Sequence, residues 1–302
     1  MTLRAVSVSI GSSNRDKKVQ TELFGQAVQL ERIGTDGDLQ QARQLFRQLD
    51  GEVQALGVGG TDLGLEIDGA WYRLHSVAPL VADVTSTPVV DGSGLKHTLE
   101  SQLAAFLEAS SEIPISPKRV LITSGADRWG MAESFISAGY ECIFGDLMFA
   151  LGLPLPLRSK QSLKRLATVM IPLVSRLPFS WLYPTGEEQE TWTPKWGRYY
   201  QWASVIAGDC HYVKRYMPRN LEGKTIVTNT TTPEDAERFR QVGVRQLVTS
   251  TPVLEGRSFG TNLLEAGLVA AAGLGRPLTR EELAATIHEL HLKPQLRTLQ
   301  DG

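Results

Sequence analysis

The stretch RVLITSGADRWGMAESFISAGYECIFGD, residues 119–146, decides the predicted fold. Val120 to Thr123 form a short apolar and partly β-branched run that ends in a glycine turn. A segment of helical character follows, and a second apolar run ends at Asp146. This order of strand, glycine loop, helix, strand and acid is typical of a β-α-β unit with parallel strands.

The glycine loop is a candidate site for a dinucleotide, whose pyrophosphate needs a tight turn and a close backbone approach. Gly125 and Gly130 have the spacing of the first and third glycines of that fingerprint, but Asp127 stands at the middle position. Its carboxylate repels a pyrophosphate unless it points away or pairs, for example with Arg128. Asp146 lies 21 residues after Gly125, where an acid would bind the adenosine ribose. The pattern predicts NAD rather than NADP, with a plain tight turn as the alternative.

The composition indicates a folded chain with a substantial core. Of the 302 residues, 42% are hydrophobic and 21% are charged, and the formal net charge is −2. The absence of a long basic run argues against nucleic acid as a partner. The only cysteines, Cys142 and Cys210, are not in a Cys-x-x-Cys pair, which argues against a disulfide framework or a zinc site.

No stretch of the sequence has the pattern of a membrane segment. The most apolar one, 147–157, contains two prolines and is shorter than the roughly 20 residues of a membrane helix. The start of the chain lacks the apolar stretch of a signal peptide. We therefore expect a cytoplasmic protein that binds a small-molecule substrate without a membrane or nucleic-acid partner. Both a monomer and a homo-oligomer are compatible with the sequence.

The chain is predicted to be α/β, with an N-terminal catalytic-type domain and a Rossmann-like parallel-sheet domain. The first domain covers residues 1–112 and the second covers residues 118–302 with a capped C-terminal helix, separated by the polar, proline-bearing segment 110–118. A hairpin is expected around Asp68-Gly69. Strands are expected at 4–10, 27–34, 53–60, 119–124, 140–145, 204–208, 225–229 and 245–250, and helices at 39–49, 233–242, 261–272 and 279–291.

An aromatic-rich insertion interrupts the second domain between residues 147 and 203. It holds four of the six tryptophans, at positions 181, 192, 196 and 202, together with the acidic run GEEQE. One interpretation is a lid or a pocket wall. The other is that these side chains only pack a long insertion onto the domain.

Several segments give the chain a family resemblance. They are VSVSIGSSNRD (6–16), VGGTDL (58–63), VVDGSGLKHTLE (89–100), GADRWGMAES (125–134), FGDLMFALGLPLPLRS (144–159), VIAGDCHYVKRYMP (205–218), TIVTNTTTPED (225–235) and EGRSFGTNLLEA (255–266). With them the chain resembles quinate/shikimate 5-dehydrogenase-like proteins and, more loosely, the two-domain amino-acid-dehydrogenase-type fold. The resemblance implies a catalytic domain followed by a nicotinamide-binding domain, with the active site between them.

The resemblance also implies residue roles. Shikimate dehydrogenases use a Lys and an Asp that bind the reacting hydroxyl and relay its proton, and Lys96 matches that Lys, with Asp91 as its predicted partner. We expect partial burial to lower the pKa of Lys96 so that it can take the proton. The family's Gly-Ala-Gly-Gly-Ala loop is replaced here by Gly-Ala-Asp-Arg-Trp. The side chains that would hold a substrate carboxylate are the hydroxyls of Ser7, Ser9, Ser12 and Ser13, and the nearby cation is Arg15.

Other strand ends carry polar loops that suit a ligand. Asn229 and Thr230 could bond a carboxamide or a ribose, and GDCH at 208–211 could face the same cleft. GSSNRD at 11–16 and EGRSFG at 255–260 are candidate anion sites. The predicted function is an NAD(P)-dependent oxidoreductase acting on a hydroxylated carboxylic acid such as quinate or shikimate. A phosphate- or anion-binding transferase and a non-catalytic ligand sensor are the alternatives, and no metal site is predicted.

Overall fold

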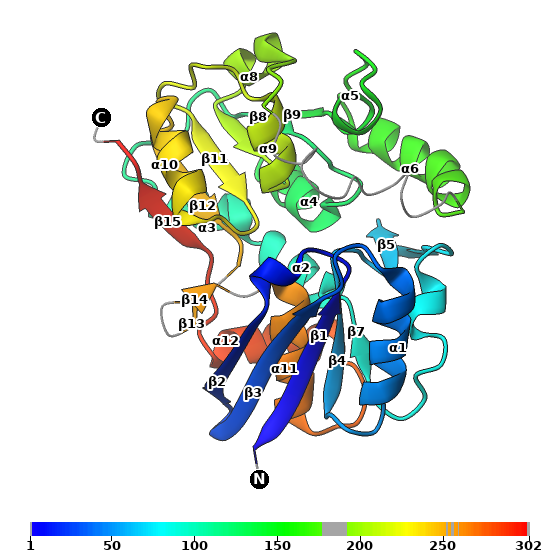
Figure 1. Cartoon of the computed structure of the whole chain (residues 1–302). Coiled ribbons are helices and arrows are strands. Elements are labelled where there is room, and N and C mark those ends of the chain that lie inside the picture. The colour runs from blue at the N-terminus through cyan, green and yellow to red at the C-terminus, as the bar shows by residue number, and fades with distance from the viewer. Residues whose placement is uncertain (1, 177–191, 252, 255–256, 259, 301–302) are drawn as a thin grey trace.

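The structure is a computed structural model that describes residues 2–176, 192–251, 253–254, 257–258 and 260–300. Two β-sheets with helices on their faces form its two halves (Figure 1). The predicted α/β class with a parallel-stranded second sheet is confirmed.

The first sheet has the strand order β2-β3-β1-β4-β7. Only β2 is antiparallel to its neighbour. Side chains alternate between the two faces of β1, so Val6 and Val8 pack toward α1 while Ala5 packs toward α11. The strands and these two helices are β1 (Leu3–Ser9), β2 (Lys17–Leu23), β3 (Gln26–Gly34), β4 (Ala55–Gly59), β7 (Val89–Val90), α1 (Leu39–Leu49) and α11 (Thr261–Ala272).

The second sheet has the strand order β15-β12-β11-β10-β8-β9, with only β15 antiparallel. Its central strands are buried on both faces, which explains their nearly continuous apolar sequences. Its strands are β8 (Arg119–Ile122), β9 (Glu141–Phe144), β10 (Val205–Ala207), β11 (Thr225–Thr228), β12 (Gln246–Thr249) and β15 (Gln295–Thr298). The helices that cover it include α3 (Leu103–Ser110), α4 (Trp129–Ser137), α8 (Gly197–Trp202), α9 (Cys210–Tyr216) and α10 (Pro233–Gln241).

Local sequence signals set several elements as predicted. Asp38 caps α1 by accepting hydrogen bonds from two main-chain amides, and α1 spans the predicted 39–49. Asp68 and Gly69 both have positive φ between β5 (Gly64–Ile67) and β6 (Ala70–Arg73), as the hairpin turn requires. Thr279 and Glu282 form the predicted capping box of α12 (Arg280–Glu289).

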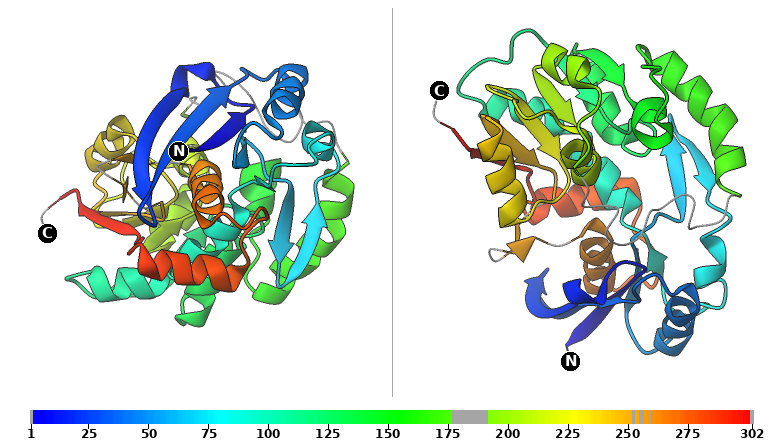
Figure 2. Two further views of the ribbon diagram at one scale, coloured as in Figure 1. Left: turned by 90° about the horizontal axis from the view of Figure 1, so that it is seen from below. Right: turned by 45° about the horizontal axis from the view of Figure 1, so that its top comes forward.

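The two sheets do not divide the chain at 112/118, the predicted domain boundary. Helix α11 packs on the first sheet and on α2 (Ser93–Glu100), and α12 packs on α2, although both helices were assigned to the second domain. Helix α3, assigned to the first domain, packs on α4 of the second sheet. In Figures 1 and 2 the orange α11 lies against the blue strands. The reason is that α11 is buried along nearly its whole length and needs a sheet face to cover it. The apolar sequence of α11 does not indicate which of the two sheets it covers.

The described part of the insertion packs onto the second half of the molecule. Tyr199 and Tyr200 of α8 are buried in the core of the second sheet, and Leu163 of α6 (Lys160–Val174) joins the core on its other face. The insertion also contains α5 (Asp146–Leu151). Trp181 and the acidic run lie outside the described residues, so the proposed lid is an expectation that the structure does not address.

Gly92 allows α2 to begin directly against α11. Its φ is +85°, and a Cβ atom there would overlap the main-chain nitrogen of Asn262. We expect Gly92→Ala to destabilise the protein by about 2–6 kcal/mol, because a left-handed backbone and a forced close contact each cost about 1–3 kcal/mol. Urea unfolding followed by circular dichroism measures the loss.

Gly25→Ala is the matched control for this prediction. Gly25 also has positive φ, +70°, but nothing lies within 4 Å of the added Cβ. Its cost should therefore be only the backbone part, about 1–2 kcal/mol. Equal losses for the two variants would show that the contact between α2 and α11 is not a tight one.

Candidate functional site

The candidate site lies at the carboxyl ends of the strands of the second sheet. From β8 the chain goes outward to β9, then crosses back to β10 on the other side of β8. In α/β sheets this reversal opens a crevice at which ligands bind. The loops that follow β8 and β10, residues 123–128 and 208–209, stand at this point.

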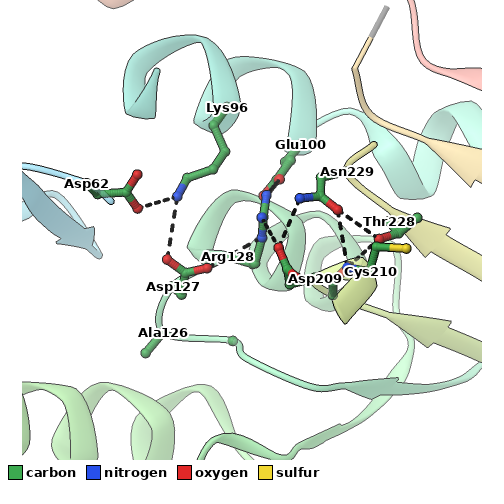
Figure 3. A network of polar contacts seen from close by, with 12 residues as sticks. Asp62, Lys96, Glu100, Ala126, Asp127, Arg128, Asp209, Cys210, Thr228 and Asn229 are labelled. Atoms are coloured by element: carbon green, nitrogen blue, oxygen red, sulfur yellow. Dashed lines mark hydrogen bonds and ion pairs between the residues drawn. The ribbon is translucent and has the colours of Figure 1, made fainter. Parts of the chain in front are cut away.

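Lys96 connects this point to the first sheet (Figure 3). It stands on α2, and its Nζ lies 2.7 Å from Asp62 Oδ2 and 3.5 Å from Asp127 Oδ1. Asp62 follows β4 of the first sheet, whereas Asp127 belongs to the glycine loop of the second. The Lys96 side chain is only 12% exposed, and that of Asp62 is 17% exposed. Lys96 therefore faces the glycine loop as predicted.

The charges around Lys96 set its titration. Burial alone would lower the pKa of Lys96, but the carboxylates of Asp127 and Asp62 raise it above the ordinary value. The prediction of a lowered lysine pKa is wrong, because the acids on both sides outweigh the loss of solvent. Burial raises the pKa of Asp62 to about 7, although the Lys96 charge opposes the rise. Burial also opposes the shift at Asp127, but Lys96 and Arg128 hold the pKa of Asp127 below its usual range.

Asp91 is not the acid beside Lys96. Its carboxylate accepts hydrogen bonds from the main-chain amides of Leu63, at 2.6 Å, and Ser93, at 2.9 Å. It thus fixes the loop that carries Asp62 and the start of α2. The predicted pair of Lys96 and Asp91 is corrected to Lys96 and Asp62. Asp62 lies in the segment VGGTDL at the end of a buried strand, and this position was the signal that could have found it.

Arg128 is a buried cation shared by three carboxylates. Its Nη1 lies 2.5 Å from Glu100 Oε1, its Nη2 lies 2.9 Å from Asp209 Oδ2, and its Nε lies 3.5 Å from Asp127 Oδ2. Asn229 Nδ2 donates to the same Asp209 oxygen at 2.9 Å. The loops after β8, β10 and β11 are therefore joined to α2 through one guanidinium (Figure 3). Arg128 thus pairs with Asp127, as one interpretation of the loop expected, and its role in binding a cofactor stays a prediction.

Asp146 lies beside the glycine loop, as its position in the sequence predicted. Its two oxygens accept hydrogen bonds from the amides of Gly125, at 3.1 Å, and Ala126, at 2.8 Å. Burial raises the pKa of Asp146 to about 6 in spite of these bonds. A carboxylate has about four lone-pair positions, so roughly two remain for another donor.

The two glycines of the loop allow close packing of side chains and helices. A Cβ on Gly125 would lie 2.8 Å from Phe144 Cδ1 and 2.9 Å from Leu163 Cδ2. A Cβ on Gly130 would lie 2.8 Å from the carbonyl oxygen of His97 on α2. Both positions therefore need glycine for packing, whether or not a pyrophosphate binds.

The remaining predicted ligand residues make internal contacts. Asn262 Nδ2 donates to Ser7 Oγ at 2.5 Å, and Arg32 Nη2 donates to Ser9 Oγ at 2.9 Å. Ser12 Oγ accepts from the Asn14 amide, the Ser13 amide donates to Asp36, and Arg15 is exposed. Thr230 Oγ1 lies 2.9 Å from Thr251 Oγ1. Their roles in binding a substrate or cofactor stay predictions, and part of the expected anion site at 255–260 lies outside the described residues.

Three further features concern a metal site, a membrane helix and the thiol of Cys210. Within the part of the chain that the structure describes, no cluster of His, Cys, Asp and Glu could hold a metal ion. None of the described helices is long and apolar enough to cross a membrane. Burial raises the pKa of the Cys210 thiol, which makes it a poor nucleophile.

The fold and the site define a two-sheet α/β protein with a cluster of paired charged side chains at a strand-order reversal. The chain belongs to the family described as Domain of unknown function (DUF8754), whose model matches residues 94–299. A second model, Domain of unknown function (DUF8753), matches residues 4–91. The two matches meet next to Gly92. No curated protein matches the chain.

Solved structures that match the chain include enzymes and a binding protein. The malic enzyme of Entamoeba histolytica is 10% identical at a TM-score of 0.39, and the match covers 93% of this chain and 60% of that one. The hetero-hexameric glutamate dehydrogenase of Thermus thermophilus is 14% identical at a TM-score of 0.45, covering 96% and 74%. GanP, a glucose-galactose binding protein from Geobacillus stearothermophilus, is 9% identical at a TM-score of 0.39, covering 100% and 99%. Likeness at this level carries no argument about function.

Removal of the buried cation should be costly. Arg128→Met leaves the carboxylates of Glu100 and Asp209 without their partner, and Glu100 is only 1% exposed. Breaking a buried ion pair from one side costs about 3–5 kcal/mol, so the urea midpoint should fall strongly. Arg240→Met is the control, because its pair with Glu237 is exposed and screened by solvent, so the urea midpoint should change little. Similar losses in both variants would contradict a special role for Arg128.

Proposed function

We propose that this protein is a nicotinamide-dependent oxidoreductase that acts on a small hydroxylated carboxylic acid, such as quinate or shikimate, between its two sheets. The observation that supports this most is the position of Lys96 between Asp62 of the first half and Asp127 on the glycine loop of the second. A reacting hydroxyl needs a proton acceptor on one side and a cofactor on the other. This is the place where groups from both halves meet.

The residues around the loop suit a dinucleotide at three points. Asp146 keeps acceptor positions for a ribose diol. The carboxylate of Asp127 is turned toward Lys96 and Arg128, so two cations offset its charge next to a pyrophosphate. Asn229 and Thr230 follow β11 at the same edge of the sheet; one of the two hydrogens of Asn229 Nδ2 is left beside its bond to Asp209, and the hydroxyl of Thr230 pairs with that of Thr251. When bound, the nicotinamide would supply the hydride acceptor.

The side chains of the cleft divide the remaining work between them. Lys96 stays charged because its pKa is raised, so it can donate hydrogen bonds to the substrate oxygen and stabilise the negative charge that develops there. Asp62, with a pKa of about 7, is the better proton acceptor, since a general base works best when its pKa is near the operating pH. Asp127 balances the charge of Lys96 and orients it.

Asp62→Asn should lower kcat by about 10²–10⁴-fold while the cofactor Kd stays nearly unchanged, because only the proton acceptor is lost. In the unmodified protein, kcat/KM should rise as pH increases through about 7, since Asp62 must lose its proton to act as a base. This rise should be absent from the residual activity of Asp62→Asn. Initial rates with NAD and quinate or shikimate between pH 5.5 and 9 measure both effects.

Asp83→Asn is the control for the Asp62 experiment. Asp83 pairs with Arg43 on the surface of the first half, away from the cleft. It should keep full activity and an unchanged pH profile. Turnover of Asp62→Asn equal to that of the unmodified protein would rule out the assigned role.

The cofactor preference should depend on the charge of Asp146. We expect NAD to bind more tightly than NADP at pH 8, because the ionised carboxylate repels a 2′-phosphate. Below about pH 6 the carboxylate gains a proton and the preference should shrink. Titration of protein fluorescence with each cofactor at pH 5 and pH 8 measures it. Tighter binding of NADP at pH 8 would contradict the assignment of Asp146.

A ligand-binding protein without catalysis is the second candidate. One observation favours it: the amides of Gly125 and Ala126 are already bonded to Asp146, and Arg128 fills the crevice with a cation of the protein itself. Thermal-shift measurements separate the two functions. Stabilisation by a hydroxy acid but by neither NAD nor NADP would favour the binding protein.

A further inference from the structure

A groove separate from the Lys96 site lies between the hairpin of β5 and β6 and helix α6. Strand β6 and the residues just after it form one wall, and the last turns of α6 form the other. Both views of Figure 2 show the cyan hairpin alongside the green α6. The volume of the groove is about 220 Å³, which is room for roughly seven water molecules at about 30 Å³ each. The groove can therefore hold a small organic molecule.

Three basic residues line the groove. They are Arg73, His75 and Arg176, and none of the described residues around them in the lining is an Asp or a Glu. Within the described part of the chain, the side chains of Arg73 and His75 form no hydrogen bond or ion pair. Arg176 Nη1 donates one bond to the carbonyl oxygen of Pro172 at 2.7 Å. A guanidinium has five N–H donors, so most of those of Arg176 remain.

The acids of the same hairpin pair with other cations. Glu66 forms an ion pair with Arg280 of α12. Asp68 forms ion pairs with Lys160, at 3.1 Å, and with Lys164, both on α6. Neither acid lines the groove. The described residues thus leave the positive charge of the groove unbalanced, which favours a ligand that carries negative charge.

The other residues of the groove are mainly apolar and aromatic. Trp71 is 52% exposed although it is a large hydrophobic side chain, and Ile171 and Pro172 lie on the α6 side. Tyr72 Oη lies 3.4 Å from Thr168 Oγ1 of α6, so Tyr72 connects the two walls. Aromatic rings of ligands pack well on such side chains.

We propose that this groove is a binding site for a small aromatic carboxylate, whose ring packs on the aromatic wall and whose charge is balanced by the basic residues. Guanidinium groups bind carboxylates through charge-assisted hydrogen bonds. A ligand ammonium would meet like charge, and an inorganic anion would leave the apolar wall uncovered. Lys96 and Asp62 do not line the groove, so the site does not depend on the proposed function.

A matched pair of ligands tests the site. Fluorine NMR titration measures the affinity of para-fluorobenzoate and of para-fluorobenzamide, which keeps the ring and removes the charge. The benzoate should bind the unmodified protein at least about tenfold more tightly, because hydrogen bonds to a charged group are the stronger ones. Arg73→Met should weaken benzoate binding by about tenfold and leave the benzamide nearly unchanged. Inorganic phosphate should compete only weakly, since it has no ring.

Arg165→Met and Lys96→Met are the controls. Arg165 is an exposed arginine of α6 that does not line the groove, and neither variant should change the affinity for para-fluorobenzoate. Equal binding of the two ligands, or an unchanged benzoate affinity in both Arg73→Met and Arg176→Met, would overturn the site. Phosphate that competes as well as the benzoate would overturn the aromatic class of ligand. Binding lost in Lys96→Met but kept in Arg73→Met would place the acid at Lys96, which rejects the groove and supports the proposed function.

Discussion

The ion pairs of Arg128 are the interaction on which the arrangement of the cleft depends. One guanidinium joins Glu100 on α2, Asp209 after β10 and Asp127 on the glycine loop. Because α2 follows the last strand of the first sheet, these contacts fix the first half of the molecule against the strand ends of the second. A buried charge of either sign is tolerated only with its partners, so the position of each group depends on the others. The place of Lys96 follows from this arrangement.

Burial makes the acids of the cleft titrate near neutrality. It raises the pKa of Asp62 and of Glu265 to about 7 and that of Asp146 to about 6. The pKa of Lys96 is also raised, because the carboxylates of Asp127 and Asp62 flank it, and Lys96 therefore stays charged. The charge around Lys96 therefore changes as Asp62 and Asp146 lose their protons. Such shifted groups are typical of functional sites, and the proposed division of roles between Lys96 and Asp62 uses this difference.

Helix α11, late in the chain, packs back on the first sheet and holds α2 in place. Helix α11 covers one face of the first sheet, and Glu265 on it accepts a hydrogen bond from the amide of Leu95 on α2. Gly92 lets α2 begin against the same helix. The helix that carries Lys96 and Glu100 is thus held by α11 on one side and by Arg128 on the other.

The sequence by itself determined many of the elements and part of the charged cluster. Alternation and caps predicted α1, the Asp68-Gly69 hairpin and α12, and the spacing of Gly125 and Asp146 predicted that this acid lies beside the glycine loop, because such signals are local. Edge strands β2 and β15 were missed, because the alternation of Val19, Thr21 and Leu23 in β2 is short and β15 has only four residues. Only the tertiary structure decided that α11 covers the first sheet, that Asp62 rather than Asp91 pairs with Lys96, and that the pKa of Lys96 rises. The physical reason is that these properties depend on residues far apart in the sequence, whose distances and burial arise only when the two sheets pack together.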